Sequence, residues 1–311
     1  MRACWLAVLA ISVGCRSAER TTLYVDPALA ALVSSDAVLV AGVRMESLRA
    51  TPAYKRWIAG KPLPQLDDLA GRLGVDPRKD LWELLISSDG KQTLTLARGK
   101  FGGLGLEPRF EGARRTPYKG YTLIGEERAA LVFMNATTVA AGPAPALRAL
   151  IDRRGRSSRL SPLVEKARTL PAATQLWLVS SDARALAAEL PATGNAAPLA
   201  KILAMLDAAT LAADLRSGIR LEASGLCRTE TDARTVHDAL RGLIGLARLT
   251  TPDDAPELLR AYDGFTVRQD QRAVQLRAEI SQDLLDKLIA RFQQGGLPVK
   301  LPDALRAPRG M

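Results

Sequence analysis

Two segments of this 311-residue chain alternate apolar and polar side chains, and this alternation constrains the fold more than any other feature. In Ala273–Ser281 every second residue is apolar, and residues 219–228 follow the same pattern. Successive side chains of a β-strand point to opposite faces of the sheet, so each segment has one buried and one solvent-exposed face. The pattern predicts an α+β fold in which helices cover one face of a mostly antiparallel sheet. Residues 231–249, with apolar side chains at helical spacing, are expected to form such a helix.

The two halves of the chain present the same order of expected elements, which predicts an internal duplication. Each half begins with a strand, continues with helices and a first hairpin, and ends with a second hairpin that leads into a helix. These elements are expected at 37–43, 45–58, 66–73, 81–101, 121–135 and 144–153 in the first half, and at 174–180, 183–190, 199–206, 209–228, 265–280 and 282–292 in the second. The order fails in one place, because the helix at 231–249 has only the glycine-rich stretch 102–112 as its counterpart.

This order predicts two similar α+β domains at 31–156 and 173–294, joined by a linker at 157–172. Residues 15–30 are expected to be a short tether. Residues 295–311 contain three glycines, three prolines and little periodicity, so a flexible tail is expected there.

The first fifteen residues are typical of an export signal. An apolar run, WLAVLAISVG, follows Arg2 and ends at Cys15. A membrane-spanning helix needs about 20 apolar residues, whereas the apolar part of an export signal needs about 7–15. Residues 12–15 resemble the lipobox of bacterial lipoproteins in Gly14 and Cys15, while Ser12 and Val13 depart from the usual leucine and small residue.

The lipobox resemblance implies cleavage after residue 14 and a diacylglycerol on the Cys15 sulfur, which would hold the protein to a membrane. Arg16 stands where Asp would resemble an inner-membrane retention signal, so the resemblance favours the periplasmic side of the outer membrane if the host has two membranes. An ordinary secretory signal cut elsewhere is the alternative. The stretches 51–58, 73–85 and 96–101 resemble uncharacterised exported bacterial proteins, and that resemblance implies no activity.

Cysteine content and charge agree with export. Of three cysteines, Cys4 lies in the signal and Cys15 is the expected lipid acceptor, so Cys227 has no partner for a disulfide within the mature chain. Cys227 occupies an apolar position of a strand and is expected to be a buried, unreactive thiol. The net charge of +10 points to anionic headgroups, a cell-wall polymer or another envelope protein as neighbours, and not to nucleic acid. An arginine-rich composition without any function is the alternative.

No catalytic, metal or cofactor motif is recognisable, so we expect a protein that is not an enzyme and binds no cofactor. His237 is the only histidine, which leaves no histidine pair for zinc, and no Cys-x-x-Cys occurs. His237 is expected to be a surface or partly buried residue, with Asp238 pointing away from it. Asp253, Asp254 and Glu257 are expected near the start of a helix, where acidic residues favour the helix dipole.

The sequence therefore predicts a lipid-anchored envelope protein with a non-enzymatic binding or scaffolding role. Its candidate interaction surface is the solvent-exposed face of the second-half strands, with mixed charge from Arg220, Glu222, Arg268, Arg277 and Glu279. One alternative is a carrier whose sheet and helices separate enough to hold a lipid or other apolar ligand, which requires a cavity that is lined by aliphatic side chains and continuous from one end. A less favoured alternative is an envelope hydrolase, which requires a carboxylate pair with shifted pKa values in a cleft.

Overall fold

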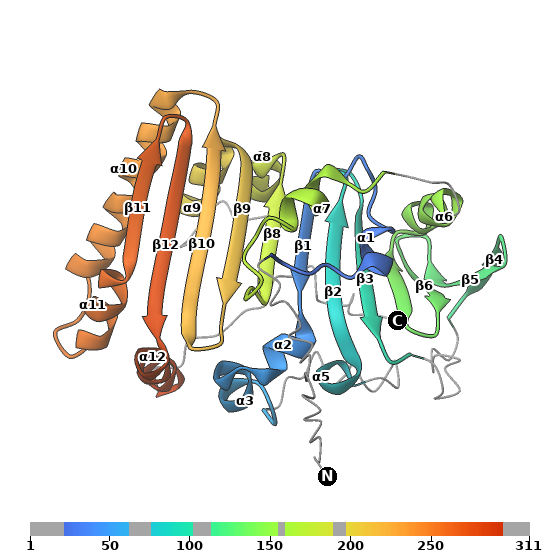
Figure 1. Cartoon of the computed structure of the whole chain (residues 1–311), viewed down its shortest axis with the longest axis horizontal. Helices are drawn as coiled ribbons and strands as arrows, with labels where there is room; N and C mark the ends of the chain where they lie inside the picture. Colours follow the sequence, from blue (N-terminus) through green and yellow to red (C-terminus); the bar gives the residue numbers. More distant parts are fainter. Residues whose placement is uncertain (1–21, 62–75, 102–112, 155–158, 189–196, 295–311) are drawn as a thin grey trace, which may run out of the picture.

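A computed structural model describes residues 22–61, 76–101, 113–154, 159–188 and 197–294, and Figure 1 shows a broad sheet with helices on both faces. The elements of the first half are α1 (Pro27–Ala30), β1 (Leu39–Val43), α2 (Met45–Ala50), α3 (Pro52–Trp57), α5 (Pro77–Asp80), β2 (Leu81–Ser88), β3 (Thr93–Gly99), β4 (Arg115–Tyr118), β5 (Tyr121–Glu126), β6 (Ala129–Asn135), β7 (Thr138–Gly142) and α6 (Ala144–Arg153). Those that follow are α7 (Pro162–Ala167), β8 (Leu176–Ser180), α8 (Ala183–Ala188), α9 (Ala197–Ala204), β9 (Leu206–Asp214), β10 (Gly218–Cys227), α10 (Glu230–Leu249), α11 (Pro256–Asp263), β11 (Phe265–Asp270), β12 (Ala273–Ser281) and α12 (Gln282–Gln294).

All the described strands form one antiparallel sheet, in the order β11-β12-β10-β9-β8-β1-β2-β3-β7-β6-β5-β4. The predicted α+β class and antiparallel sheet are confirmed. The two predicted domains do not have separate sheets, however, because β1 pairs with β8 along its whole length, from Leu39 opposite Ser180 to Val43 opposite Leu176. This junction between the halves is the centre of the sheet.

The strand order is alike on the two sides of the β1–β8 pair. It runs β1-β2-β3-β7-β6 on one side and β8-β9-β10-β12-β11 on the other. In the first half, the hairpin that corresponds to β11–β12 is therefore β6–β7. The prediction that residues 121–135, which form β5 and β6, correspond to β11–β12 was wrong. The reason is that β7 pairs with β3 as β12 pairs with β10, a long-range pairing that alternation within one strand does not reveal. The duplication itself stays a prediction.

Helices cover opposite faces of the sheet in the two halves. The register places Leu85, Leu96 and Val132 on one face, here called the front face, where they form a buried cluster with Leu147 and Leu150 of α6. In the second half the buried cluster lies on the other face, the rear face, between the strands and helices α8, α9 and α10. In Figure 1, α1 lies in front of β3 and α9 lies behind β10.

Two segments expected to be connectors are parts of the front core. Leu23, Val25 and Leu29 are buried, so the expected tether at 15–30 is wrong for residues 23–30. The expected linker at 157–172 contains α7, whose apolar residues Leu163 and Val164 are buried in the same cluster. Their apolar side chains cover strands that would otherwise face water. The expected flexible tail at 295–311 lies outside the described residues.

Helix ends follow local chemistry. The expected helix at 45–58 divides into α2 and α3 at Thr51, because Pro52 lacks the backbone N–H that would continue α2, and the Thr51 hydroxyl caps α3 by accepting from the Tyr54 N–H. Helix α6 has the bounds expected for it, and α10 begins with a capping box between Thr229 and Asp232. The helix expected at 66–73 lies outside the described residues.

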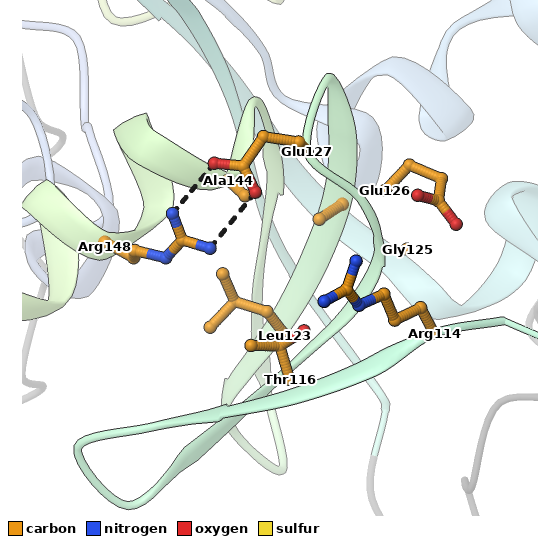
Figure 2. A pocket seen from close by; sticks show the side chains of 9 residues that line it. Arg114, Thr116, Leu123, Gly125, Glu126, Glu127, Ala144 and Arg148 are labelled. Carbon is orange, nitrogen blue, oxygen red and sulfur yellow. Dashed lines mark hydrogen bonds and ion pairs between the residues drawn. The ribbon is translucent and has the colours of Figure 1, made fainter.

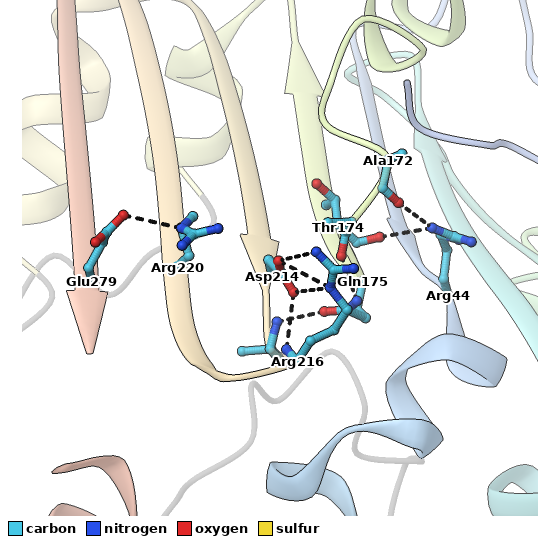
Figure 3. A network of polar contacts seen from close by, with 10 residues as sticks. Arg44, Ala172, Thr174, Gln175, Asp214, Arg216, Arg220 and Glu279 are labelled. Atoms are coloured by element: carbon cyan, nitrogen blue, oxygen red, sulfur yellow. Dashed lines mark hydrogen bonds and ion pairs between the residues drawn. The ribbon is translucent and has the colours of Figure 1, made fainter. Parts of the chain in front are cut away.

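The centre of the sheet is held by a close approach between Gly42 and Trp177, which face each other across β1 and β8. The indole of Trp177 is buried and occupies the space in which a side chain at position 42 would begin. Nearby, Arg44 donates to the carbonyl oxygens of Ala172 and Thr174, at 2.8 and 3.3 Å, and ties the end of β1 to the segment before β8 (Figure 3).

A polar cluster fastens the N-terminal segment to the first half. Glu83 of β2 is buried and accepts from the backbone N–H of Asp26 at 3.3 and 3.4 Å. The Asp26 carboxylate caps α1 and binds Arg98 of β3 at 3.2 Å. Burial, the dominant cause, raises the pKa of Glu83 to about 7 despite the opposing hydrogen bond from the Asp26 N–H, and the nearby Asp26 carboxylate contributes to the rise.

Replacement of Gly42 by alanine is expected to destabilise the protein by about 1–3 kcal/mol, because the new methyl group forces the Trp177 indole to move. Thermal unfolding measures the effect. Gly242→Ala is the matched control: a side chain at position 242 of α10 meets nothing, so alanine there raises the stability by up to about 1 kcal/mol. Equal melting temperatures for Gly42→Ala and the unmodified protein would contradict the packing described.

The stability of the protein is expected to fall as the pH rises from 5 to 8.5. The folded state raises the pKa of Glu83 from 4.5 to about 7, so Glu83 favours folding most below pH 4.5, and this contribution is lost as the pH rises through 7. The difference amounts to roughly 3 kcal/mol. In Glu83→Gln most of this dependence should disappear, whereas Glu279→Gln, on an exposed strand position, should retain it. Urea unfolding at a series of pH values gives the answer, and identical slopes for all three proteins would refute it.

Candidate apolar ligand pocket

The rear face of the first half holds a hollow of about 500 Å³, whose described lining contains no helical residue. The residues that line it belong to β2, β3, β5, β6 and β7 or lie just outside these strands. The described lining residues are Leu81, Leu84, Thr95, Ala97, Phe101, Ala113, Ile124, Gly125, Arg128, Ala129, Ala130, Leu131, Phe133, Val139, Ala141 and Gly142. This volume lies in the range of about 300–1,000 Å³ that is usual for small-molecule sites.

The strand register explains why the sheet is hollow here. Two rows of side chains cross the strands, one of Leu84, Ala97, Val139 and Phe133 and one of Thr95, Ala141, Leu131 and Ile124. The central strands β3 and β7 contribute small side chains to the rows, while β2, β5 and β6 contribute large ones. The small residues form the floor and the large ones form the walls.

An aromatic pair lines one end of the pocket. The rings of Phe101 and Phe133 meet edge to face with centroids 6.4 Å apart. At the other end lies the turn between β5 and β6, where Arg128 lines the pocket. Apolar surface that faces water is unfavourable by about 25 cal/mol per Å², so an apolar ligand that fills the hollow gains free energy.

A second, much smaller pocket lies against the same β5–β6 hairpin and shares Gly125 and Ala130 with the apolar pocket (Figure 2). It measures about 50 Å³, which is room for water and not for an organic ligand. Its polar wall is an ion pair in which Arg148 of α6 donates to both carboxylate oxygens of Glu127, at 2.8 and 3.2 Å. The pair fixes α6 to the turn that bounds the apolar pocket.

The five charged residues of the expected interaction surface share the front face of β10, β11 and β12. Opposite charges face each other across the strands, since Arg220 lies opposite Glu279 and Glu222 opposite Arg277. Arg220 donates to Glu279 at 3.2 Å (Figure 3), and Arg268 is exposed on β11. Four of the five charges compensate each other in pairs, which also suits a solvated surface, and a role in binding stays a prediction.

The residues considered for catalysis occupy structural positions. Cys227 is buried, as predicted, and burial raises the pKa of its thiol. His237 is partly buried on α10, but its Nδ1 lies 2.9 Å from the Asp238 carboxylate, so the expectation that Asp238 points away was wrong. Asp254 and Glu257 both bind Arg291 of α12, at 2.9 and 3.0 Å. Within the described ranges, no group of three or more potential metal ligands occurs.

Glu83 and Asp26 are the carboxylates that come nearest to the arrangement a hydrolase requires. Neither lines either of the two pockets described above. The Asp26 oxygens are engaged by the N-terminus of α1 and by Arg98, and Glu83 is engaged by the Asp26 N–H. These contacts give the pair a structural role.

Among the helices described here, none is long and apolar enough to cross a membrane. Cys15 and the rest of the expected signal lie outside the described residues.

No protein-family model and no curated protein sequence matches the chain. Crystal structures of a protein named TP0453 are distantly similar. Crystal form I aligns with a TM-score of 0.47 and 13% identity over 86% of this chain and 98% of that one. Crystal form III aligns with a TM-score of 0.48 and 14% identity over 86% and 99% of the two chains. At this distance the similarity assigns no function.

Proposed function

We propose that the protein binds an apolar ligand without enzymatic action, in the pocket on the rear face of β2, β3, β5, β6 and β7. The observation that carries this proposal is the hollow of about 500 Å³, which is lined by Leu, Ile, Val, Phe, Ala and Gly residues together with Thr95 and Arg128. Sequence reasoning treated a carrier of an apolar ligand as the alternative to a scaffold and required a cavity lined by aliphatic residues. The pocket has such a lining, but it lies on one face of the sheet and not between the sheet and its helices, where the carrier hypothesis placed the ligand. The largely paired charges of the front face give a scaffolding role less support.

We further propose that the protein is exported and held to the cell envelope by lipid on Cys15, on the periplasmic side of the outer membrane if there are two membranes. The support is the short apolar run after Arg2 and the residues Gly14-Cys15. A membrane partner suits a binder of apolar molecules, because the membrane is where such molecules are found. Anionic polymers or another envelope protein remain candidate neighbours of the charged front face.

An origin by duplication is also part of the proposal. The support is the like order of strands on the two sides of β1 and β8. In this view the halves diverged in the face that their helices cover, since α6 packs on the front face and α10 on the rear face.

A large side chain on the floor of the pocket should weaken the binding of an apolar ligand. N-phenyl-1-naphthylamine, a neutral dye that fluoresces in apolar sites, is expected to bind the unmodified protein, and Ala97→Phe is expected to weaken binding at least tenfold because the new ring occupies the floor of the pocket. Thr266→Phe adds the same ring at an exposed front-face position of β11 and should leave binding within twofold. Absence of dye binding, or equal binding by both variants, would overturn the proposed function, with melting temperatures showing that all three proteins are folded.

Labelling of producing cells with radioactive palmitate tests the anchor. Label is expected on the unmodified protein and not on Cys15→Ser, whereas Cys227→Ser, which alters the buried thiol, should be labelled as before. Equal labelling of the Cys15→Ser variant would show that the lipobox resemblance is misleading.

A further inference from the structure

We propose that the ligand is an acidic amphiphile, whose single apolar chain lies along the pocket and whose acidic group binds Arg128. This inference rests on the proposed function and adds the chemical class of the ligand to it.

Arg128 is the only charged residue among the described lining residues. It lies in the turn between β5 and β6 and is exposed, so its guanidinium can meet a ligand at the rim without losing its hydration. A guanidinium offers paired donors that match the two oxygens of a carboxylate or phosphate. The charge at the rim therefore favours an acidic group over a neutral or cationic one.

The neighbouring charges leave Arg128 available. The acidic residue next to Arg128 is Glu127, whose two carboxylate oxygens accept from the two terminal guanidinium nitrogens of Arg148. Glu126 lines the small pocket and not the apolar one. No residue in the described part of the chain forms an ion pair with Arg128.

The shape of the pocket sets the direction of the ligand. Along β6 the lining runs from Ala129, beside Arg128, to Phe133, which contacts Phe101 at the far end. Four residues of a strand span on the order of 14 Å. An extended chain of about that length fits with its acidic end at Arg128 and its apolar end at the two phenyl rings.

A displacement experiment at pH 8 tests this assignment. Dodecanoate, dodecanol and dodecylammonium, which have the same alkyl chain, each compete with bound N-phenyl-1-naphthylamine. On the unmodified protein, dodecanoate is expected to displace the dye at a concentration at least tenfold lower than dodecanol or dodecylammonium. Arg128→Gln should reduce this preference to twofold or less while dye binding itself is retained. Arg268→Gln removes the same charge from the front face of β11 and should keep the full preference.

The outcomes separate the two proposals. If the dye binds and the three ligands displace it equally well, or if Arg128→Gln keeps the preference for dodecanoate, the acidic ligand is refuted and the apolar pocket stands. If the dye does not bind to the unmodified protein, the proposed function fails, and the assignment of the ligand class fails with it.

Discussion

The pairing of β1 with β8 is the interaction on which the rest of the structure depends. It joins two groups of strands that are far apart in the sequence into one sheet, and its register places Gly42 opposite Trp177. A shift by one residue would move every side chain of one half to the other face of the sheet. The buried indole of Trp177 specifies this register, because it fits only opposite a residue without a side chain. Any larger residue at position 42 collides with the indole.

Once the register is fixed, the positions of the helices determine the chemistry of each surface. The front face is covered in the first half by α1, α6 and α7, and the rear face is covered in the second half by α8, α9 and α10. Among the described residues, the two surfaces that these helices leave differ in character. The front face of the second half presents compensated charges, whereas the rear face of the first half presents apolar side chains around a hollow. An apolar surface of this kind in a folded protein is typical of a binding site.

Strands and helices with a strong local pattern were predictable from the sequence. The alternation in Ala273–Ser281 gave β12 and the common face of the five charged residues, and the bounds of α6 were correct. The pocket was not predictable, because Ala97 and Ala141 become neighbours of the same floor only when β3 pairs with β7, more than forty residues away. The burial of Glu83 was missed for a similar reason, since its cover is the segment around Asp26.

The buried N-terminal segment limits how far an anchored protein could reach. The chain enters the core at Leu23, and Thr22 already forms a bridge with Pro171, so Cys15 lies seven positions before the first residue of the folded body. Fully extended, seven residues span at most about 25 Å, which is less than the thickness of a bilayer with its headgroups. A lipid on Cys15 would therefore keep the folded body beside its own membrane. Such a protein could exchange a ligand with that membrane or with a neighbour beside it, and could not ferry the ligand across the space between two membranes.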